Sequence, residues 1–190
     1  MTQIIPDPND IPTSEAPLIV FSDHTSGLIE WAIKMRTKGE YNHIMLFLEQ
    51  GYFVSQGNTY SVTPMERYMK KGNRLLFVKI KGLTVQQKQR FKESVDRKLS
   101  LPWHKKLYDW VGILGQAIGF KNLNINGLNY CSEDVRLHLF QLIPYLTEEQ
   151  SETVKAISEF QAHGSPQDHR EVVKKYPNVF ELVYLWQSDL

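Results

Sequence analysis

Residues 43–57 read HIMLFLEQGYFVSQG. Two apolar runs flank Glu49-Gln50-Gly51, and a short polar break ending in glycine between such runs is typical of a β-hairpin. We therefore expect two antiparallel strands joined by a tight turn. Two further apolar runs, LIVF at 18–21 and RLLFVKIKG at 74–82, also predict strands. Together these runs predict a small antiparallel sheet.

Helical periodicity surrounds these strands. Thr84 and Gln87 are spaced as a capping box at the start of a helix over 84–99, whose apolar face would contain Val85, Phe91, Val95 and Leu99. The spacing also predicts helices over 24–40, 131–143, 147–161 and 165–176, whereas 179–186 is compatible with either a strand or a helix. The expected fold class is α+β, a small antiparallel sheet packed with helices.

The chain has 190 residues, enough for one domain with a substantial core. Residues 1–17 contain four prolines and read as an extended, proline-rich N-terminal arm. Residues 18–190 are expected to form a single domain. The arm is a candidate contact for a protein partner.

The composition excludes several classes of function. A net charge of +1 gives no general attraction to nucleic acid, and the few basic residues that cluster read as solvated helix ends. We find neither a secretory signal nor an apolar stretch long enough to span a bilayer, so a cytoplasmic location is the default expectation.

Cys131 is the only cysteine, which excludes an internal disulfide and a cysteine-based zinc cluster. The chain also lacks an HExxH motif and any paired-histidine arrangement. We therefore expect neither a metal site nor a cofactor.

The surroundings of Cys131 allow two interpretations. Cys131 shares an apolar helical stripe with Val135, Leu139 and Leu142, as a buried structural cysteine would. However, Asn129 is a natural N-cap, which places the thiol in the first turn of the helix. Unpaired backbone N–H groups and the helix dipole favour a thiolate there, and the same N–H groups can bind an oxyanion.

A cysteine nucleophile needs a base, and six histidines are present. His43 opens an apolar strand after a polar segment, where its side chain can enter a cleft. His138 lies seven residues after Cys131, about 10 Å along the helix axis, which is too far for a direct hydrogen bond. His169 lies in a charged helix and is expected to be solvated. Position alone also permits a structural role for His43.

The ordered set YNHIMLFLEQGYFVSQG, VTPMERY and YCSEDVRLHL resembles the circularly permuted branch of the NlpC/P60 papain-like cysteine peptidase superfamily, especially its YiiX-like members. In that branch the histidine strand precedes the cysteine helix. The matching residues are His43, Val62-Thr63-Pro64 and Cys131-Ser132-Glu133, and the resemblance covers about residues 18–185. It implies a permuted papain-like core.

The resemblance also implies a mechanism. Cys131 would form an acyl-enzyme with an amide or peptide carbonyl, and His43 would act as the base. The residue that orients His43 falls within VSQG, where Gln56 fits best and Ser55 is the second choice. Tyr130 and Ser132, on either side of the nucleophile, are candidate substrate contacts. This chain departs from the pattern at DHTSG (23–27), where relatives commonly have a Gly-Asp pair.

The resemblance points first to a thiol-dependent hydrolase of amide or peptide bonds, with cell-wall peptides as the substrate class. A second hypothesis is a thiol acyltransferase or lipid ester hydrolase, because related permuted proteins resemble the lecithin:retinol acyltransferase group. The apolar stretch WVGILGQAIGF (110–120) is the candidate membrane-facing segment for that reading. A third is a catalytically inactive structural or interaction protein that retains the fold.

Overall fold

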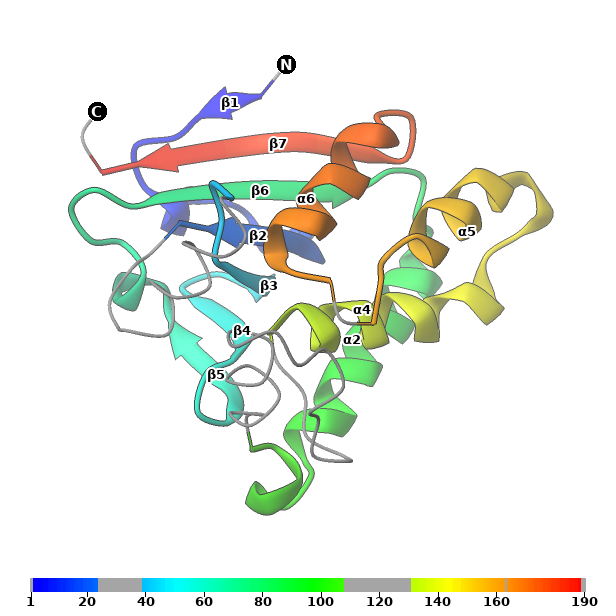
Figure 1. Ribbon diagram of the computed structural model, residues 1–190, viewed down its shortest axis with the longest axis horizontal. Helices are drawn as coiled ribbons and strands as arrows, with labels where there is room; N and C mark the ends of the chain where they lie inside the picture. Colours follow the sequence, from blue (N-terminus) through cyan, green and yellow to red (C-terminus); the bar gives the residue numbers. More distant parts are fainter. Residues whose placement is uncertain (1, 24–38, 108–130, 163, 189–190) are drawn as a thin grey trace.

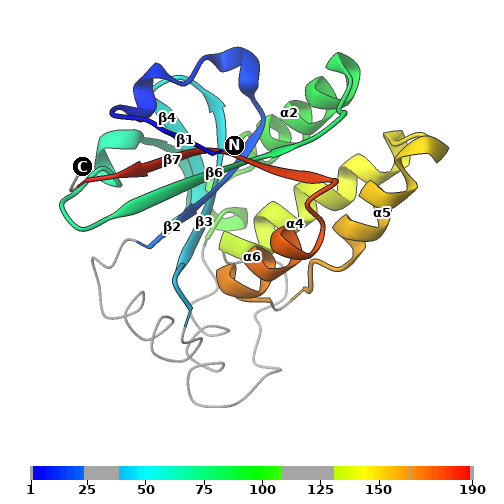
Figure 2. The ribbon, with the colours of Figure 1, turned by 90° about the horizontal axis from the view of Figure 1, so that it is seen from above.

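The computed structural model describes residues 2–23, 39–107, 131–162 and 164–188. Within these ranges seven strands form one sheet in the order β1-β7-β6-β2-β3-β4-β5 (Figure 1). The longer helices gather on one side of that sheet (Figure 2). The chain therefore has an α+β fold, as the sequence predicts.

The central strands follow the predicted hairpin. β3 (His43–Glu49) and β4 (Tyr52–Gln56) pair in antiparallel orientation, and Gly51 in the turn between them has a φ of 84°. Glycine adopts that left-handed conformation without steric cost. β2 (Leu18–Ser22) pairs with β3 on one side and with β6 (Arg74–Ile80) on the other. The strands predicted at 18–21 and 74–82 are thus confirmed.

The sheet is larger than expected and it is mixed. β5 (Tyr60–Pro64) extends it beyond β4, and β7 (Phe180–Gln187) pairs in antiparallel orientation with β6. β1 (Gln3–Ile4) then adds to β7 in parallel. The sequence prediction missed β1 and β5 because one is only two residues long and the other contains exposed, polar positions. Residues 179–186, for which the sequence allowed either a strand or a helix, form most of the strand β7.

The helices begin and end close to the predicted residues. They are α2 (Val85–Leu99), α4 (Cys131–Leu142), α5 (Ser151–Ser158) and α6 (Pro166–Lys175). The capping box of Thr84 and Gln87 is present at α2, and Ser165 caps α6 with Pro166 at its first position. Single 3-10 turns cover Pro8–Asp10, Thr13–Glu15, Met65–Arg67, Trp103–Lys105, Ile143–Tyr145 and Glu148–Gln150. Residues 24–38 of the helix predicted over 24–40, and the whole apolar segment 110–120, lie outside the described residues.

One predicted core position of α2 is wrong. Val85 is 86% exposed, whereas Phe91 and Val95 are buried as expected. Gln87 takes the inward position in the first turn, where its side-chain amide donates to the carbonyl of Tyr145. A buried amide that is hydrogen-bonded in this way costs little, so an apolar residue is not required there.

Two apolar cores lie on opposite faces of the sheet. The helix-side core contains Ile19, Phe21, Ile44 and Leu46 from the strands and buried residues of all four helices. The opposite core contains Leu18, Val20, Met45 and Phe47. Because side chains alternate along a strand and both faces are covered, β2 is apolar at consecutive positions, which explains the run LIVF.

The N-terminal segment covers the second face. Ile5 and Ile11 are buried in the opposite core, and Lys79 of β6 donates to Glu15 at 2.7 Å. Residues 1–17 are irregular, as their prolines predict, but their described part packs against the sheet. This segment is therefore part of the fold on which the site depends.

Candidate functional site

Cys131 is the first residue of α4 and is only 3% exposed. Val135, Leu139 and Leu142 follow it on the buried stripe, which confirms the predicted apolar face of the helix. The thiol thus lies at a helix N-terminus and at the margin of the helix-side core. Tyr130 and the expected cap Asn129 lie outside the described residues.

Ser132 anchors the start of α4. Its hydroxyl is fully buried and donates to the carbonyl of Gly164 at 2.6 Å. Gly164 stands two residues before α6, and a side chain there would crowd the ring of His169, because a Cβ would lie 3.0 Å from its Nε2. The hydroxyl of Ser132, expected to contact substrate, is thereby engaged in joining α4 to the N-terminal end of α6.

His43 begins β3 and is half-buried. Its ring stacks on the ring of Tyr68, with centroids 5.6 Å apart and planes 12° apart. The hydroxyl of Tyr68 lies 3.4 Å from Nε2 of His43 and 3.2 Å from Oγ of Ser55. His43, Tyr68 and Ser55 therefore form one polar chain.

Ser55 and Gln56, the two candidates for the residue that orients His43, lie on opposite faces of β4. Ser55 reaches His43 through Tyr68, whereas the side-chain amide of Gln56 donates to the carbonyl of Lys106 at 2.8 Å. The alternation of β4 places neighbouring residues on opposite faces, with Phe53 in the opposite core and Val54 in the helix-side core. Ser55 accordingly shares the face of His43, and Gln56 faces the helices.

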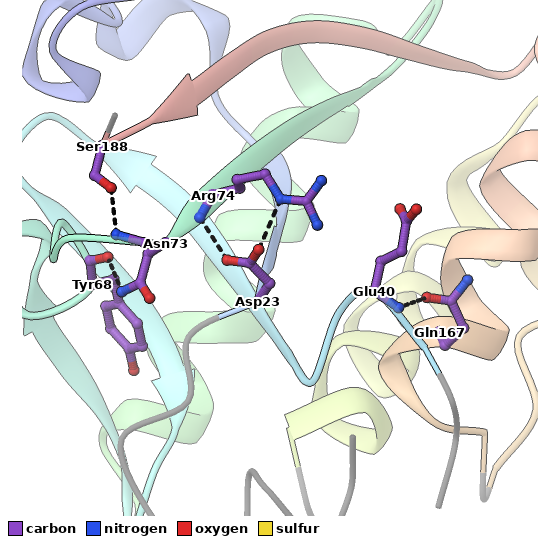
Figure 3. A network of polar contacts seen from close by, with 8 residues as sticks. Asp23, Glu40, Tyr68, Asn73, Arg74, Gln167 and Ser188 are labelled. Atoms are coloured by element: carbon purple, nitrogen blue, oxygen red, sulfur yellow. Dashed lines mark hydrogen bonds and ion pairs between the residues drawn. The ribbon is translucent and has the colours of Figure 1, made fainter. Parts of the chain in front are cut away.

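Tyr68 is a residue that the sequence reasoning missed. It is buried, and its carbonyl accepts a hydrogen bond at 2.9 Å from the side-chain amide of Asn73 (Figure 3). Tyr68 is the last residue of the motif VTPMERY, of which only Val62-Thr63-Pro64 matches the family pattern. The motif therefore includes the residue that contacts His43. Nothing in the sequence indicates that its ring reaches back to His43.

The starts of α4 and β3 are both attached to the N-terminal end of α6. Ser132 holds α4 to Gly164, and Oε1 of Gln167 accepts a hydrogen bond at 3.0 Å from the backbone N–H of Glu40 (Figure 3). Glu40 lies three residues before His43. Neighbours of Cys131 and of His43 are thus linked to the same end of α6, but the two residues belong to different faces of the sheet. Cys131 is part of the helix-side core, whereas His43 shares the face of the opposite core.

Two other histidines are buried within the helix layer. His138 lies between the hydroxyl of Tyr60, 2.8 Å from Nε2, and that of Ser94, 3.0 Å from Nδ1. Because Ser94 donates its own proton to the carbonyl of Phe91, it accepts from Nδ1–H, and Tyr60 donates to Nε2. Burial lowers the pKa of His138 to about 3 and raises the pKa of Tyr60. This network stabilises the neutral imidazole.

The expectation that His169 is solvated is wrong. His169 is fully buried, and its ring lies 4.7 Å from that of Phe160. Burial lowers its pKa to about 4, while Nε2 lies 3.3 Å from the carbonyl of Gln161. Most charged residues of α6, namely Asp168, Glu171, Lys174 and Lys175, are exposed, so a polar sequence context concealed the inward position of His169.

Charged groups gather where β2 ends and β3 begins. Asp23 accepts hydrogen bonds from the backbone N–H of Arg74 at 2.5 Å and from its Nε at 2.8 Å (Figure 3). The guanidinium of Arg74 lies 5.8 Å from the ring centre of Tyr41. Burial raises the pKa of Tyr41, and the charges of Arg74 and Arg170 oppose that rise. Two arginines therefore act on this tyrosine.

The part of the chain that the structure describes contains no group of three or more histidine, cysteine, aspartate or glutamate side chains arranged to hold a metal ion. Among the described residues, no helix is both long and apolar enough to cross a membrane.

The chain matches no protein-family model, and no curated protein matches it significantly. The interpretation of the site therefore depends on its own residues and their geometry.

Proposed function

We propose that the protein is a thiol-dependent hydrolase of amide or peptide bonds with a permuted papain-like core, in which Cys131 is the nucleophile and His43 the base. The observation that carries the proposal is that residues near both of them are attached to one end of α6. Ser132 bonds to Gly164 there, and Glu40 bonds to Gln167. The only thiol of the chain stands at the first residue of α4, next to Ser132, and His43 begins β3 three residues after Glu40.

The chemistry proceeds through a thioester. His43 takes the proton of Cys131, and Sγ attacks the carbonyl carbon of the substrate. Backbone N–H groups at the start of α4 stabilise the oxyanion, and His43 then protonates the leaving amine. Water, deprotonated by the same imidazole, hydrolyses the thioester and restores the thiol. Cell-wall peptides are the substrate class that the family resemblance implies.

The orientation of His43 comes from Tyr68 and Ser55 in this mechanism. For Nδ1 to accept a proton, Nε2 must carry one, and Nε2–H then donates to the hydroxyl of Tyr68, 3.4 Å away. Ser55 supports that hydroxyl at 3.2 Å. Gln56 remains the alternative orienting residue, with an amide nitrogen already bonded to Lys106.

A second candidate is a catalytically inactive structural or interaction protein. The burial of Cys131 and its place on an apolar stripe favour this reading, because cysteine is among the residues most often buried. In that case the only role of the Cys131 side chain is to pack between α4 and the sheet.

The pH dependence of alkylation by iodoacetamide separates these candidates, since Cys131 is the only thiol. A nucleophile should react in the native protein with a midpoint below about 8.5, the value of a free thiol. His43→Ala should move the midpoint upward, whereas His104→Ala, at an exposed histidine, should not. Reaction only after denaturation would contradict the enzyme and support the structural protein.

A further inference from the structure

Arg170 is a buried cation that forms no salt bridge with any residue that the structure describes. It lies on the inward side of α6, three residues after Gln167 and three before the buried Val173, and is 8% exposed. Within the described part of the chain its Nε and Nη1 are buried and make no hydrogen bond. An arginine in this state is costly, because the desolvation of its charge is not offset by a partner.

The side chain of Asn42 is a second buried polar group, whereas its backbone N–H donates to the carbonyl of Ser22. It is 1% exposed, and neither Oδ1 nor Nδ2 makes a hydrogen bond in the part of the chain that the structure describes. Tyr41, immediately before it, and Ile44, two residues after it, both belong to the helix-side core, which Val173 of α6 also joins. Native proteins satisfy nearly all such groups, and exceptions often mark a site for an absent ligand.

Both groups belong to the same part of the fold. α6 is attached to the residues before β3 by the bond from Glu40 N–H to Gln167, and a Cβ on Gly39 would lie 2.7 Å from Cβ of Gln167. Arg170 lies about one helical turn further along α6, and its charge acts on Tyr41, the neighbour of Asn42. The unpaired donors therefore lie around the segment that leads into His43.

We propose that Arg170 and Asn42 form a subsite that binds a carboxylate group of a ligand. The second arginine nearby, Arg74, is already paired with Asp23, and the carboxylate of Glu40 also acts on Arg74 and Tyr41. A ligand carboxylate brings one negative charge to Arg170, whereas a phosphate dianion brings two into a region that already contains Glu40. The planar guanidinium offers several N–H donors to carboxylate oxygens, and the Asn42 amide supplies two more.

That this carboxylate belongs to a substrate of Cys131 depends on the proposed function, whereas its binding does not. The substrate would then be a peptide with a free carboxylate close to the bond that is cleaved. A buried unpaired arginine in the free protein is consistent with such a role, because binding sites commonly sacrifice stability for recognition.

The test uses the full chain with Cys131→Ser, so that no turnover interferes. Binding of N-acetylglycine is measured by titration calorimetry at constant ionic strength, with N-acetylglycinamide as the neutral analogue and inorganic phosphate as the tetrahedral anion. We expect saturable binding of the carboxylate only. Arg170→Met should weaken it at least about tenfold, as expected for the loss of a charged hydrogen bond, and Arg97→Met, at an exposed arginine, should not.

Arg170→Lys provides a second variant should the methionine variant fail to fold, and it should bind several-fold more weakly because lysine lacks the planar fork. Absence of carboxylate binding in the parent protein would overturn the proposal, and so would equal binding of the amide or of phosphate. Binding that persists in Arg170→Met would do the same. If the protein binds the carboxylate but Cys131 proves inert, the result would support the subsite and contradict the proposed hydrolase function.

Discussion

The ring of His43 stacks on that of Tyr68, and the tyrosine hydroxyl lies 3.4 Å from Nε2. These residues are separated by 25 positions in the chain and meet because β3 and the 3-10 turn Met65–Arg67 converge at the opposite core. The contact fixes the imidazole plane. Ser55, whose Oγ lies 3.2 Å from the hydroxyl of Tyr68, is thereby linked to the proposed base through Tyr68.

We predict that Tyr68→Phe slows the alkylation of native Cys131 at pH 7 by about twofold to tenfold, the equivalent of one hydrogen bond of 0.5–1.5 kcal/mol. The phenyl ring preserves the stacking and removes only the hydroxyl. Iodoacetamide kinetics measure the effect, and Tyr52→Phe, at an exposed tyrosine, is the matched control. An unchanged rate in Tyr68→Phe together with a slower rate in Gln56→Ala would transfer the orienting role to Gln56.

His138 should be important for stability and not for catalysis. We expect His138→Ala to lower the free energy of unfolding by about 2–4 kcal/mol, because it opens a cavity and leaves the hydroxyls of Tyr60 and Ser94 without their partner. Urea titration followed by circular dichroism measures this loss. His104→Ala, at an exposed position, should change stability by less than about 0.5 kcal/mol. Equal effects of the two variants would refute the role of the network.

The stability of the protein should fall on acidification below about pH 6.5. His138 and His169 have folded-state pKa values of about 3 and about 4, below the value of about 6.5 in an unfolded chain. The unfolded state therefore takes up protons first as the pH falls, and stability present above pH 6.5 is lost. Between about pH 6.5 and 5 the slope approaches 1.4 kcal/mol per pH unit for each histidine.

Urea unfolding at several pH values measures this slope. His169→Gln should reduce it by one proton, and His104→Gln serves as the exposed comparison. A slope that is unaffected by His169→Gln would mean that the ring is protonated in the folded protein.

Removing one partner of the ion pair between Lys98 and Asp134 should lower the free energy of unfolding more than removing both partners together. The two side chains are 14% and 2% exposed. Lys98→Met should destabilise the protein by about 3–5 kcal/mol because it leaves a buried carboxylate. The double variant Lys98→Met, Asp134→Leu should recover much of that loss.

Arg90→Met, which breaks the exposed pair with Glu93, is the control and should cost less than about 1 kcal/mol. Thermal unfolding of the parent, Lys98→Met, Asp134→Leu and the double variant measures the coupling, and additive losses would contradict it.

The local elements of the fold were predictable because their signals lie within a few residues. Gly51 marks the β3–β4 turn, Thr84 and Gln87 mark the start of α2, and Ser165 with Pro166 marks the start of α6. In each case backbone preference or a hydrogen bond over three residues determines the boundary. β1 lacked such a signal, because two residues form a strand only through pairing with β7.

The hairpin, the helix that begins at Cys131 and the apolar stripe that buries it follow from local sequence patterns. Contacts between distant parts of the chain, in contrast, are needed to explain why His43 contacts Tyr68, why Gln56 faces the helices and why His169 is buried. The same holds for Arg170 and Asn42, whose buried side-chain atoms Nε and Nη1, and Oδ1 and Nδ2, make no hydrogen bond within the described ranges. The physical reason is that burial and hydrogen bonding between residues far apart in the chain are set by packing, which local preference does not encode.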